Sequence, residues 1–345
     1  MEQEHKRRVR YAGTHPRNFR EKYKEHQPEK YQGDVEKIIQ SGKTPAGMHI
    51  SIMVQEILDV LQIQPGQTGL DATLGYGGHT RRMLECLQGQ GHLYATDIDP
   101  VESEKTRARL EALGYGPDLL TIRRMNFAQL DQVAPGEPFD FVLADLGVSS
   151  MQIDDPERGF TFKHDGPLDL RLDPTAGTTA AQRLRELTEE ELSAMLVENA
   201  DEPYAEPIAR AVMRVFQQGG RIDTTRQLAA VVETALAFLP AAERKEAVKK
   251  SCQRTFQALR IDVNSEFEVL YSFLEKLPGV LKPGGRVAVL TFHSGEDRLV
   301  KKAFRQGLRD GVYSEVAQEV IRPSAQECFQ NPRARSTKLR WAIRT

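Results

Sequence analysis

Apolar residues follow two alternating patterns between residues 50 and 144. Short apolar runs, typical of buried strands, occur at 70–73, 92–97, 119–124 and 139–144. Apolar residues at helical spacing occur at 50–61, 80–87 and 100–113. Repeated strand–helix units form parallel sheets with right-handed crossovers. The first part of the chain therefore predicts an α/β fold.

The pattern changes near residue 173, because no strand-like run interrupts the helical spacing that follows. Helices are predicted at 179–184, 188–198, 206–217, 224–238 and 241–250. A long helical pattern then extends from residue 252 to residue 278. After the expected turn at Pro283-Gly284-Gly285, the sheet is predicted to resume with a strand at 286–292, a helix at 296–308 and a strand at 338–343.

These patterns divide the chain into three parts. Residues 1–45 are polar and rich in Lys and Arg, and we expect them to form a basic N-terminal arm. Residues 46–172 and 251–345 are expected to form the α/β domain. Residues 173–250 are expected to form an all-helical domain inserted into it.

The composition is that of an ordinary soluble globular protein, with 39% hydrophobic and 28% charged residues. No run of about 18 apolar residues is present, so we expect no membrane span. The N-terminus lacks the apolar segment of a secretory signal. The three cysteines are far apart and fit neither a disulfide framework nor a zinc cluster. We therefore expect a cytoplasmic protein without a metal.

The net charge of −2 excludes a general attraction to nucleic acid, but basic residues cluster locally. One cluster lies in the arm among aromatic residues, a second at 244–250 and a third at 333–344. Each can contact phosphate or form a solvated face, and the sequence leaves this choice open.

Polar residues follow the first predicted strands. The first strand leads into a turn with Gly75, Gly77 and Gly78, where a ligand can approach the backbone closely. The second ends at Asp97, in the position from which a carboxylate bonds ribose hydroxyls. Asp99 suits the N-cap of the helix that follows.

The third strand is followed by Asn126 and Phe127, which can bond and cover the edge of an adenine. Taken alone, Phe127 suits the core better. Together the strand ends describe a nucleoside site without a Walker motif or the glycine spacing of a dinucleotide site. This pattern favours S-adenosylmethionine over ATP and NAD.

Five blocks of the chain resemble the ribosomal RNA small subunit methyltransferase H family, which methylates the N4 amino group of a cytidine in the decoding region of 16S rRNA. They lie in the family's order at 71–80, 144–173, 254–264, 291–298 and 331–336, and the resemblance covers about residues 46–345. It implies a Rossmann-like class I methyltransferase sheet, S-adenosylmethionine as cofactor and 16S rRNA of the small ribosomal subunit as partner. The helical insertion resembles the family's substrate-recognition domain.

The resemblance also implies roles for single residues. The family's Gly-Gly-His loop, at the methionine and ribose side of the cofactor, is matched by Gly77, Gly78 and His79. The other cofactor-contacting positions are matched by Asp97, Phe127, Asp145 and Gln152.

Three departures from the family pattern indicate a paralogous branch. Where the family has His-x-Pro-Val, this chain has His49-Ile-Ser51-Ile52. Gly295 replaces the leucine of the block Phe-His-Ser-Leu-Glu-Asp-Arg. The arm before His49 is absent from ordinary members.

Cytosine N4 is a poor nucleophile, because its lone pair is delocalised into the ring. A hydrogen-bond acceptor for the amino protons positions N4 and favours a pyramidal nitrogen. Asp145 occupies the place where amino-methyltransferases carry such an acceptor, and we expect it to bond N4; loop capping is the alternative. His293, which ends the strand after the insertion, is expected to position the target base.

Further polar residues are candidates for contact with RNA. Some lie in the loop after the fourth strand, some on one face of the long predicted helix, and some at the basic C-terminus. Turn formation, a solvated face or a structural ion pair is the alternative for each. The candidates are Ser149, Arg158, Arg254, Arg260, Asn264, Arg333 and Arg335.

Two other functions stay open at this point. One is N-methylation of another RNA or DNA amino group. The other is a cofactor-binding ribosome-assembly factor without catalysis, against which the intact Asp145 and glycine loop argue. The oligomeric state is also open, with a homodimer as one alternative.

Overall fold

The computed structural model describes residues 51–345. The chain divides into two units, residues 1–49 and 50–345, and only the second is described, from Ser51 onward. The predicted arm, and the first two residues of the altered motif at 49–52, therefore lie outside the described residues.

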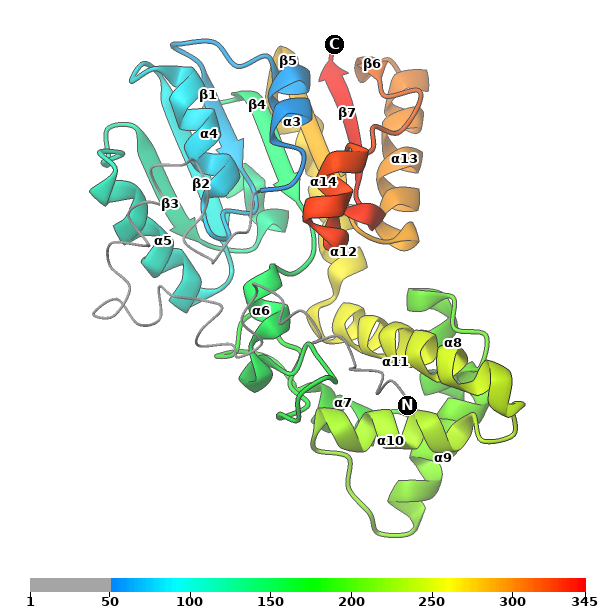
Figure 1. Cartoon of the computed structure of the whole chain (residues 1–345). Coiled ribbons are helices and arrows are strands. Elements are labelled where there is room, and N and C mark those ends of the chain that lie inside the picture. The colour runs from blue at the N-terminus through cyan, green and yellow to red at the C-terminus, as the bar shows by residue number, and fades with distance from the viewer. Residues whose placement is uncertain (1–50) are drawn as a thin grey trace, which may run out of the picture. The chain divides into compact units, whose positions relative to one another are not determined.

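A seven-stranded sheet organises the described unit, in the order β3-β2-β1-β4-β5-β7-β6 (Figure 1). The strands are β1 (Thr68–Asp71), β2 (His92–Asp97), β3 (Leu120–Arg124), β4 (Phe139–Asp145), β5 (Leu281–Thr291), β6 (Tyr313–Val316) and β7 (Lys338–Arg344). β1 to β5 are parallel, and β7 pairs antiparallel with both β5 and β6. The carboxyl ends of five strands consequently meet at one edge of the sheet.

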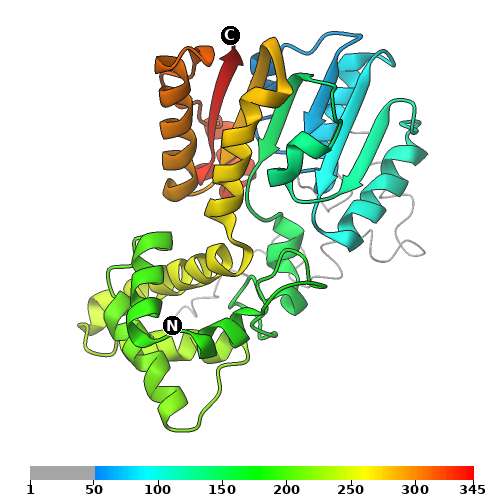
Figure 2. The ribbon, with the colours of Figure 1, turned by 180° about the vertical axis from the view of Figure 1, so that it is seen from behind.

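Helices cover both faces of this sheet. They are α3 (Val54–Leu61), α4 (Gly78–Leu87), α5 (Pro100–Ala112), the 3₁₀ helix η2 (Phe127–Gln132), α12 (Glu266–Val280) and α13 (Ser294–Arg309). α3, α4 and α5 share one apolar core with the sheet. α12, α13 and η2 share the core of the opposite face, over which Figure 2 shows α12. This is a three-layered α/β arrangement.

The remaining helices lie mainly between β4 and β5 in the chain. They are α6 (Ser150–Asp154), η3 (Pro156–Arg158), α7 (Ala180–Glu186), α8 (Glu189–Ala200), α9 (Ala205–Gln217), α10 (Thr225–Ala235) and α11 (Ala241–Asn264), with α14 (Ala325–Gln330) and η4 (Pro332–Ser336) before β7. α7 to α11 form a core of their own. Every helix of residues 51–345 is too short or too polar to span a lipid bilayer.

The structure confirms the α/β class and the Rossmann-like class I methyltransferase sheet with a helical insertion. The core of the insertion runs from Leu168 to Leu259, and α11 continues unbroken across residue 250. The insertion therefore packs on both sides of the boundaries expected from the sequence. The division into domains stays a prediction.

Several predicted elements differ from the structure, and β6, α6, α14 and the 3₁₀ helices were not predicted. The strand expected at 70–73 is β1 at 68–71, and the helix expected at 241–250 continues without a break in α11. The expected helix at 252–278 is two helices, because Ser265 adopts a left-handed backbone with φ of 49° between α11 and α12. The expected turn at 283–285 lies inside β5, where the register jumps from Phe139–Leu281 to Phe141–Arg286. Strand pairing on both sides absorbs this glycine-rich segment as a bulge. β6 and α14 are short and polar, so they carry little periodicity.

Candidate functional site

The loop after β1 is tied to the ends of the two neighbouring strands. The amide of Gly75 donates to Asp97 Oδ2 at 2.8 Å, and the amide of Asp145 donates to Thr73 Oγ1 at 2.7 Å. Asp97 ends β2 and Asp145 ends β4. The structure therefore brings the predicted cofactor residues of three strands to one edge.

Glycines allow this loop its tight course. Gly75 and Gly77 have φ of 47° and 74°, a region that side chains disfavour. A Cβ on Gly77 would lie 2.8 Å from Thr106 Cγ2, so the loop packs directly against α5. Gly77 caps α4, which begins at Gly78. The first amides of α4 have no acceptor within the helix and can bind an anionic group.

Asp99 caps a helix, as its position predicted, whereas Asp97 holds the glycine loop and its ribose contact stays a prediction. Asp97 accepts from the amides of Gly75 and Asp99, both at 2.8 Å. Burial raises the pKa of Asp97 to about 6, although these two hydrogen bonds oppose the rise. Asp99 caps α5 by accepting from the amides of Val101 and Glu102. The Asp97 carboxylate is thus held in a fixed orientation at the end of β2.

Asp71 is a buried acid to which the sequence pattern assigned no role. Its carboxylate accepts from Thr80 Oγ1 at 2.6 Å and from the amide of Thr73 at 3.1 Å, and the residue is 1% exposed. Burial raises its pKa, although these bonds oppose the rise. Asp71 therefore joins both ends of the glycine loop. The sequence feature that could have identified Asp71 is an acidic residue at the end of an apolar strand.

Asp145 and His79 face each other across the loop. His79 is 8% exposed, its Nε2 lies 2.9 Å from the carbonyl oxygen of Ile52, and its Nδ1 lies 3.4 Å from Asp145 Oδ2. Since Nε2 faces an acceptor, it carries a proton. The other nitrogen, Nδ1, faces Asp145.

The other oxygen of Asp145, Oδ1, is buried and has no hydrogen-bond partner among residues 51–345. Burial raises the pKa of this carboxyl to about 6, against the charge of His79, and the carboxylates of Asp71 and Glu296 add to the rise. An unpartnered buried oxygen is unfavourable unless something donates to it. Asp145 thus offers one acceptor atom that the described protein does not use.

His293 lies in a buried group of charged residues. Its Nε2 is 3.2 Å from Glu296 Oε1, and neither ring nitrogen makes a well-oriented hydrogen bond within the described residues. Ligand atoms of Glu266, His293 and Glu296 lie within 4.8 Å of one another, close enough for a metal to be considered. However, Arg260 donates to both oxygens of Glu266 at 2.7 and 2.9 Å. The guanidinium already supplies a cation, so this group does not require a metal ion.

The loop after β4 is held by its own polar residues. Ser149 caps α6 and forms a reciprocal capping box with Gln152. Arg158 donates to Asp99 Oδ2 at 2.7 Å and to the carbonyl oxygens of Arg171 and Leu172. Gln152 Nε2 donates to the same oxygen of Asp99 at 3.4 Å, so both residues link this loop to the end of β2. The substrate and cofactor roles expected for these residues stay predictions.

The predicted polar face of α11 turns partly inward. Asn264 accepts from the amide of Leu172 and donates to the carbonyl of Leu170, each at 2.8 Å. Arg254 is half-buried.

Phe127 of η2 packs edge-on against Phe273 at a centroid distance of 5.4 Å, as expected for a core residue. Asn264 thus holds the backbone at residues 170–172, and Phe127 packs in the core. Contact of either residue with a ligand stays a prediction.

Most basic side chains of the C-terminal cluster bond other parts of the protein. Arg333 pairs with Asp154 at 2.6 Å, and Arg340, 6% exposed, pairs with Asp297 at 2.6 Å. Arg335 is exposed and has no hydrogen bond or ion pair within the described residues. Of these three arginines, Arg335 alone has a guanidinium that no residue of 51–345 pairs with.

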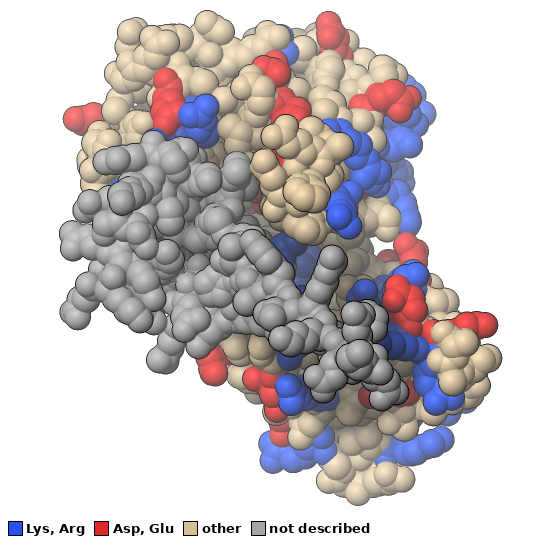
Figure 3. Space-filling view, in the orientation of Figure 1, with Lys and Arg blue, Asp and Glu red and all other residues tan. Residues whose placement is uncertain are grey.

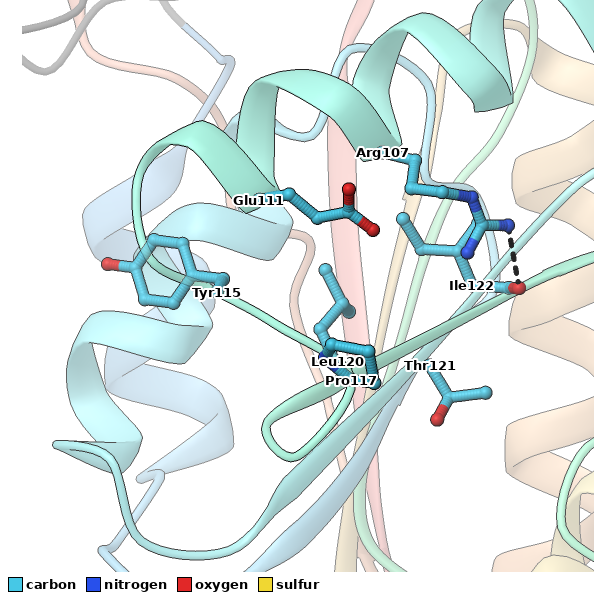
Figure 4. Close-up of a pocket in the computed structure, with 7 residues that line it drawn as sticks. All are labelled: Arg107, Glu111, Tyr115, Pro117, Leu120, Thr121 and Ile122. Carbon is cyan, nitrogen blue, oxygen red and sulfur yellow. Dashed lines mark hydrogen bonds between the residues drawn. The ribbon is translucent and has the colours of Figure 1, made fainter.

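A separate hollow lies between α5 and the start of β3 (Figure 4). Arg107 crosses it and donates to the carbonyl oxygen of Ile122 at 3.1 Å, which satisfies one acceptor of this edge strand. The hollow is at the amino end of β3, so it is not part of the edge at which the strand ends gather.

Comparison with known proteins agrees with this arrangement. Residues 46–345 match the model of the MraW methylase family. The chain is 66% identical to ribosomal RNA small subunit methyltransferase H 1 of Lachnoclostridium phytofermentans over 341 residues, 99% of this chain and 93% of that protein. It is 41% identical to ribosomal RNA small subunit methyltransferase H of Koribacter versatilis over 303 residues, 86% of this chain and 94% of that protein.

Among solved structures, an rRNA methylase from Streptococcus thermophilus is similar at a TM-score of 0.39 and 14% identity, covering 84% of this chain and 93% of that one. The family resemblance read from the five blocks is confirmed by the family model and by the curated relatives. The chain belongs to the MraW methylase family.

Proposed function

We propose that this protein transfers a methyl group from S-adenosylmethionine to the N4 amino group of a cytidine in the decoding region of 16S rRNA. The observation that carries the proposal is the buried, unpartnered Oδ1 of Asp145 at the end of β4. Such an oxygen binds an incoming donor strongly, because it has no competing bond in the described protein. The exocyclic amine of cytosine is a donor of this kind.

The residues at the strand ends fit the cofactor. The free amides at the start of α4 suit the carboxylate of its methionine part, and the oriented Asp97 carboxylate suits its ribose hydroxyls. At Gly75 and Gly77, whose φ is positive, no side chain blocks the approach of a ligand to the backbone. S-adenosylmethionine supplies an activated methyl group on a sulfonium.

The chain's own residues hold the substrate and take its proton. Asp145 Oδ1 accepts a hydrogen bond from N4, which fixes the amine and favours its pyramidal form. One amino proton must leave as the new N–C bond forms, and the same oxygen is placed to accept it. His293 orients the base through Nδ1, which has no hydrogen bond within residues 51–345, while Nε2 lies 3.2 Å from Glu296 Oε1.

The setting of the reaction is part of the proposal. The substrate is 16S rRNA within the small ribosomal subunit, and the protein acts in the cytoplasm, where that subunit is assembled. A homodimer remains a prediction that sedimentation of the full chain can test.

A methyl-transfer assay on small subunits that lack the modification tests the proposal. Asp145→Ala is expected to lower transfer by about 100-fold or more while the fold stays intact. Asp140→Ala is the matched control, because Asp140 lies at the other end of β4 and bonds Lys282. Activity of Asp145→Ala within twofold of wild type would refute the role of Asp145.

Nucleoside mass spectrometry of the product separates the alternatives. N4-methylcytidine in 16S rRNA is the expected product. A different methylated nucleoside would show that the enzyme methylates another amino group. Cofactor binding without any methyl transfer would favour a non-catalytic assembly factor.

A further inference from the structure

α13 carries a row of positive charges along its exposed side. Arg298, Lys302, Arg305 and Arg309 follow one another at spacings of four, three and four residues, and all four are exposed. At 3.6 residues per turn they lie within about 60° of arc, and the row is about 16 Å long. Phe304, on the opposite side, is 2% exposed and packs in the core. The row therefore faces outward for the length of the helix.

Among residues 51–345, an acidic side chain pairs with Arg298 alone of this row. Lys302 and Arg305 have no hydrogen bond or ion pair with any residue of 51–345. Arg298 lies 3.6 Å from Asp201, and both side chains are about two-thirds exposed, at 67% and 65%. Like charges three and four residues apart repel one another in a helix. Repulsion between these side chains therefore destabilises the helix unless an anion binds to the row.

α5 shows what an ordinary solvated helix looks like in this protein. Its exposed side mixes signs, with Lys105 paired to Glu102 at 3.1 Å and Arg107 paired to Glu104 at 3.3 Å. The whole chain has a net charge of only −2. The row on α13 is thus a local concentration of charge, and a general basic character of the chain does not explain it.

The row begins next to the candidate site. α13 starts directly after His293, at the carboxyl end of β5. Arg335 of η4 is also exposed, and η4 leads into β7, whose Lys338 pairs with Thr291 of β5. Figure 3 shows Lys and Arg side chains gathered over α13 and beside α14. A polynucleotide that enters the site can therefore extend along this surface.

We propose that the row formed by Arg298, Lys302, Arg305 and Arg309 binds the phosphate backbone of a base-paired RNA segment next to the target cytidine. This inference rests on the proposed function, since it concerns how that substrate is held. Evenly spaced cations contact phosphates without reading bases. Single-strand binders add aromatic side chains for stacking, and no exposed large apolar side chain lies on α13. Paired RNA fits the surface better for this reason.

The test removes three charges away from the site, in the variant Lys302→Gln/Arg305→Gln/Arg309→Gln. Its control is Lys105→Gln/Arg123→Gln/Arg210→Gln, which changes the net charge equally at exposed positions outside the three basic clusters. Binding is measured with a 16S rRNA fragment in which the target cytidine adjoins a duplex, over a series of salt concentrations. A single-stranded oligonucleotide with the same target is measured in parallel.

The α13 variant is expected to bind the duplex-containing fragment about 10- to 100-fold more weakly, with a salt slope shallower by about 2 to 3. KM for this RNA should rise while kcat at saturating RNA, S-adenosylmethionine affinity and binding of the single strand stay as in wild type. The control variant should behave like wild type. An unchanged salt slope for the α13 variant, or an equal loss in both variants, overturns the inference.

Wild-type protein separates this result from the proposed function. If wild type methylates the fragment and the α13 variant binds it equally well, only the docking surface is wrong. If wild type binds S-adenosylmethionine but methylates no RNA, the proposed function fails, and the docking surface fails with it.

Discussion

Gly295 is the departure from the family pattern that the structure explains most directly. A Cβ at this position would lie 2.5 Å from Phe267 Cζ, 3.0 Å from Phe267 Cε1 and 3.2 Å from His293 Cε1. The Phe267 ring therefore fills the space into which a side chain at residue 295 would extend. We expect that Gly295→Leu, which restores the family residue, destabilises this protein.

The magnitude follows from two opposing effects. Overpacking a filled site costs about 1–3 kcal/mol. Replacing glycine in a helix gains about 1 kcal/mol at most, and less here, because Gly295 lies in the first turn of α13. The clash should prevail, so the free energy of unfolding should fall by about 1–2 kcal/mol. Phe267→Ala alone should cost less than the roughly 3–5 kcal/mol of a fully buried ring, since Phe267 is half-buried.

Urea unfolding of the wild type, both single variants and the double variant measures the coupling. In Gly295→Leu/Phe267→Ala the leucine occupies the space that the ring leaves, so the double variant should be more stable than the sum of the single losses by about 1 kcal/mol or more. Additive losses, or a Gly295→Leu variant as stable as wild type, would show that the ring yields freely and that the reasoning is wrong. Methyl transfer should decline in Gly295→Leu and recover in the double variant, because His293 adjoins the same space.

Three further predictions concern charged groups. Only the ionised form of Asp145 can take the proton that leaves N4. Its pKa is raised to about 6, so kcat/KM should fall as the pH drops below about 6; a profile without this step contradicts the assignment. Asp97→Asn should weaken S-adenosylmethionine binding about tenfold at pH 7. In calorimetry, the affinity of wild type for S-adenosylmethionine should decline below about pH 6, and the affinity of Asp97→Asn should not. Burial raises the pKa of Asp297, but Arg340 and Lys338 have the larger effect and lower it below its usual value. The ion pair of Asp297 with Arg340 therefore stabilises the fold above the unfolded pKa of about 4, and this stabilisation is lost as the pH falls through the lower pKa of the folded state. Arg340→Met should accordingly cost about 3 kcal/mol in urea unfolding at pH 7, with a smaller deficit in acid, and a deficit that does not depend on pH would refute this account.

Local pattern was sufficient for much of the fold. The alternation of apolar runs and helical spacing predicted β2 at the residues where it occurs and β3, β4 and β7 to within one residue at each end. Strand ends also predicted which side chains meet, because parallel strands end at the same edge of a sheet. Asp97 and Asp145 lie beside the glycine loop for this reason.

The choice between paired and free charges depended on tertiary structure. Arg158 was expected at the RNA, but its guanidinium bonds Asp99, which is 59 residues away in the chain. Arg333 bonds Asp154 across 179 residues. No local pattern shows such pairs, because partners that are distant in sequence meet only when the strands are ordered.

The sequence by itself determined the class of fold, the family and the sheet edge at which the candidate site residues gather, since each depends on residue spacing along single elements. The tertiary structure decided which acceptor of Asp145 stays unused and which basic residues keep a free charge. It also placed the row on α13 next to the candidate site. Hydrogen bonding and ion pairing are satisfied across elements, so only the packed chain reveals which groups remain available to a ligand.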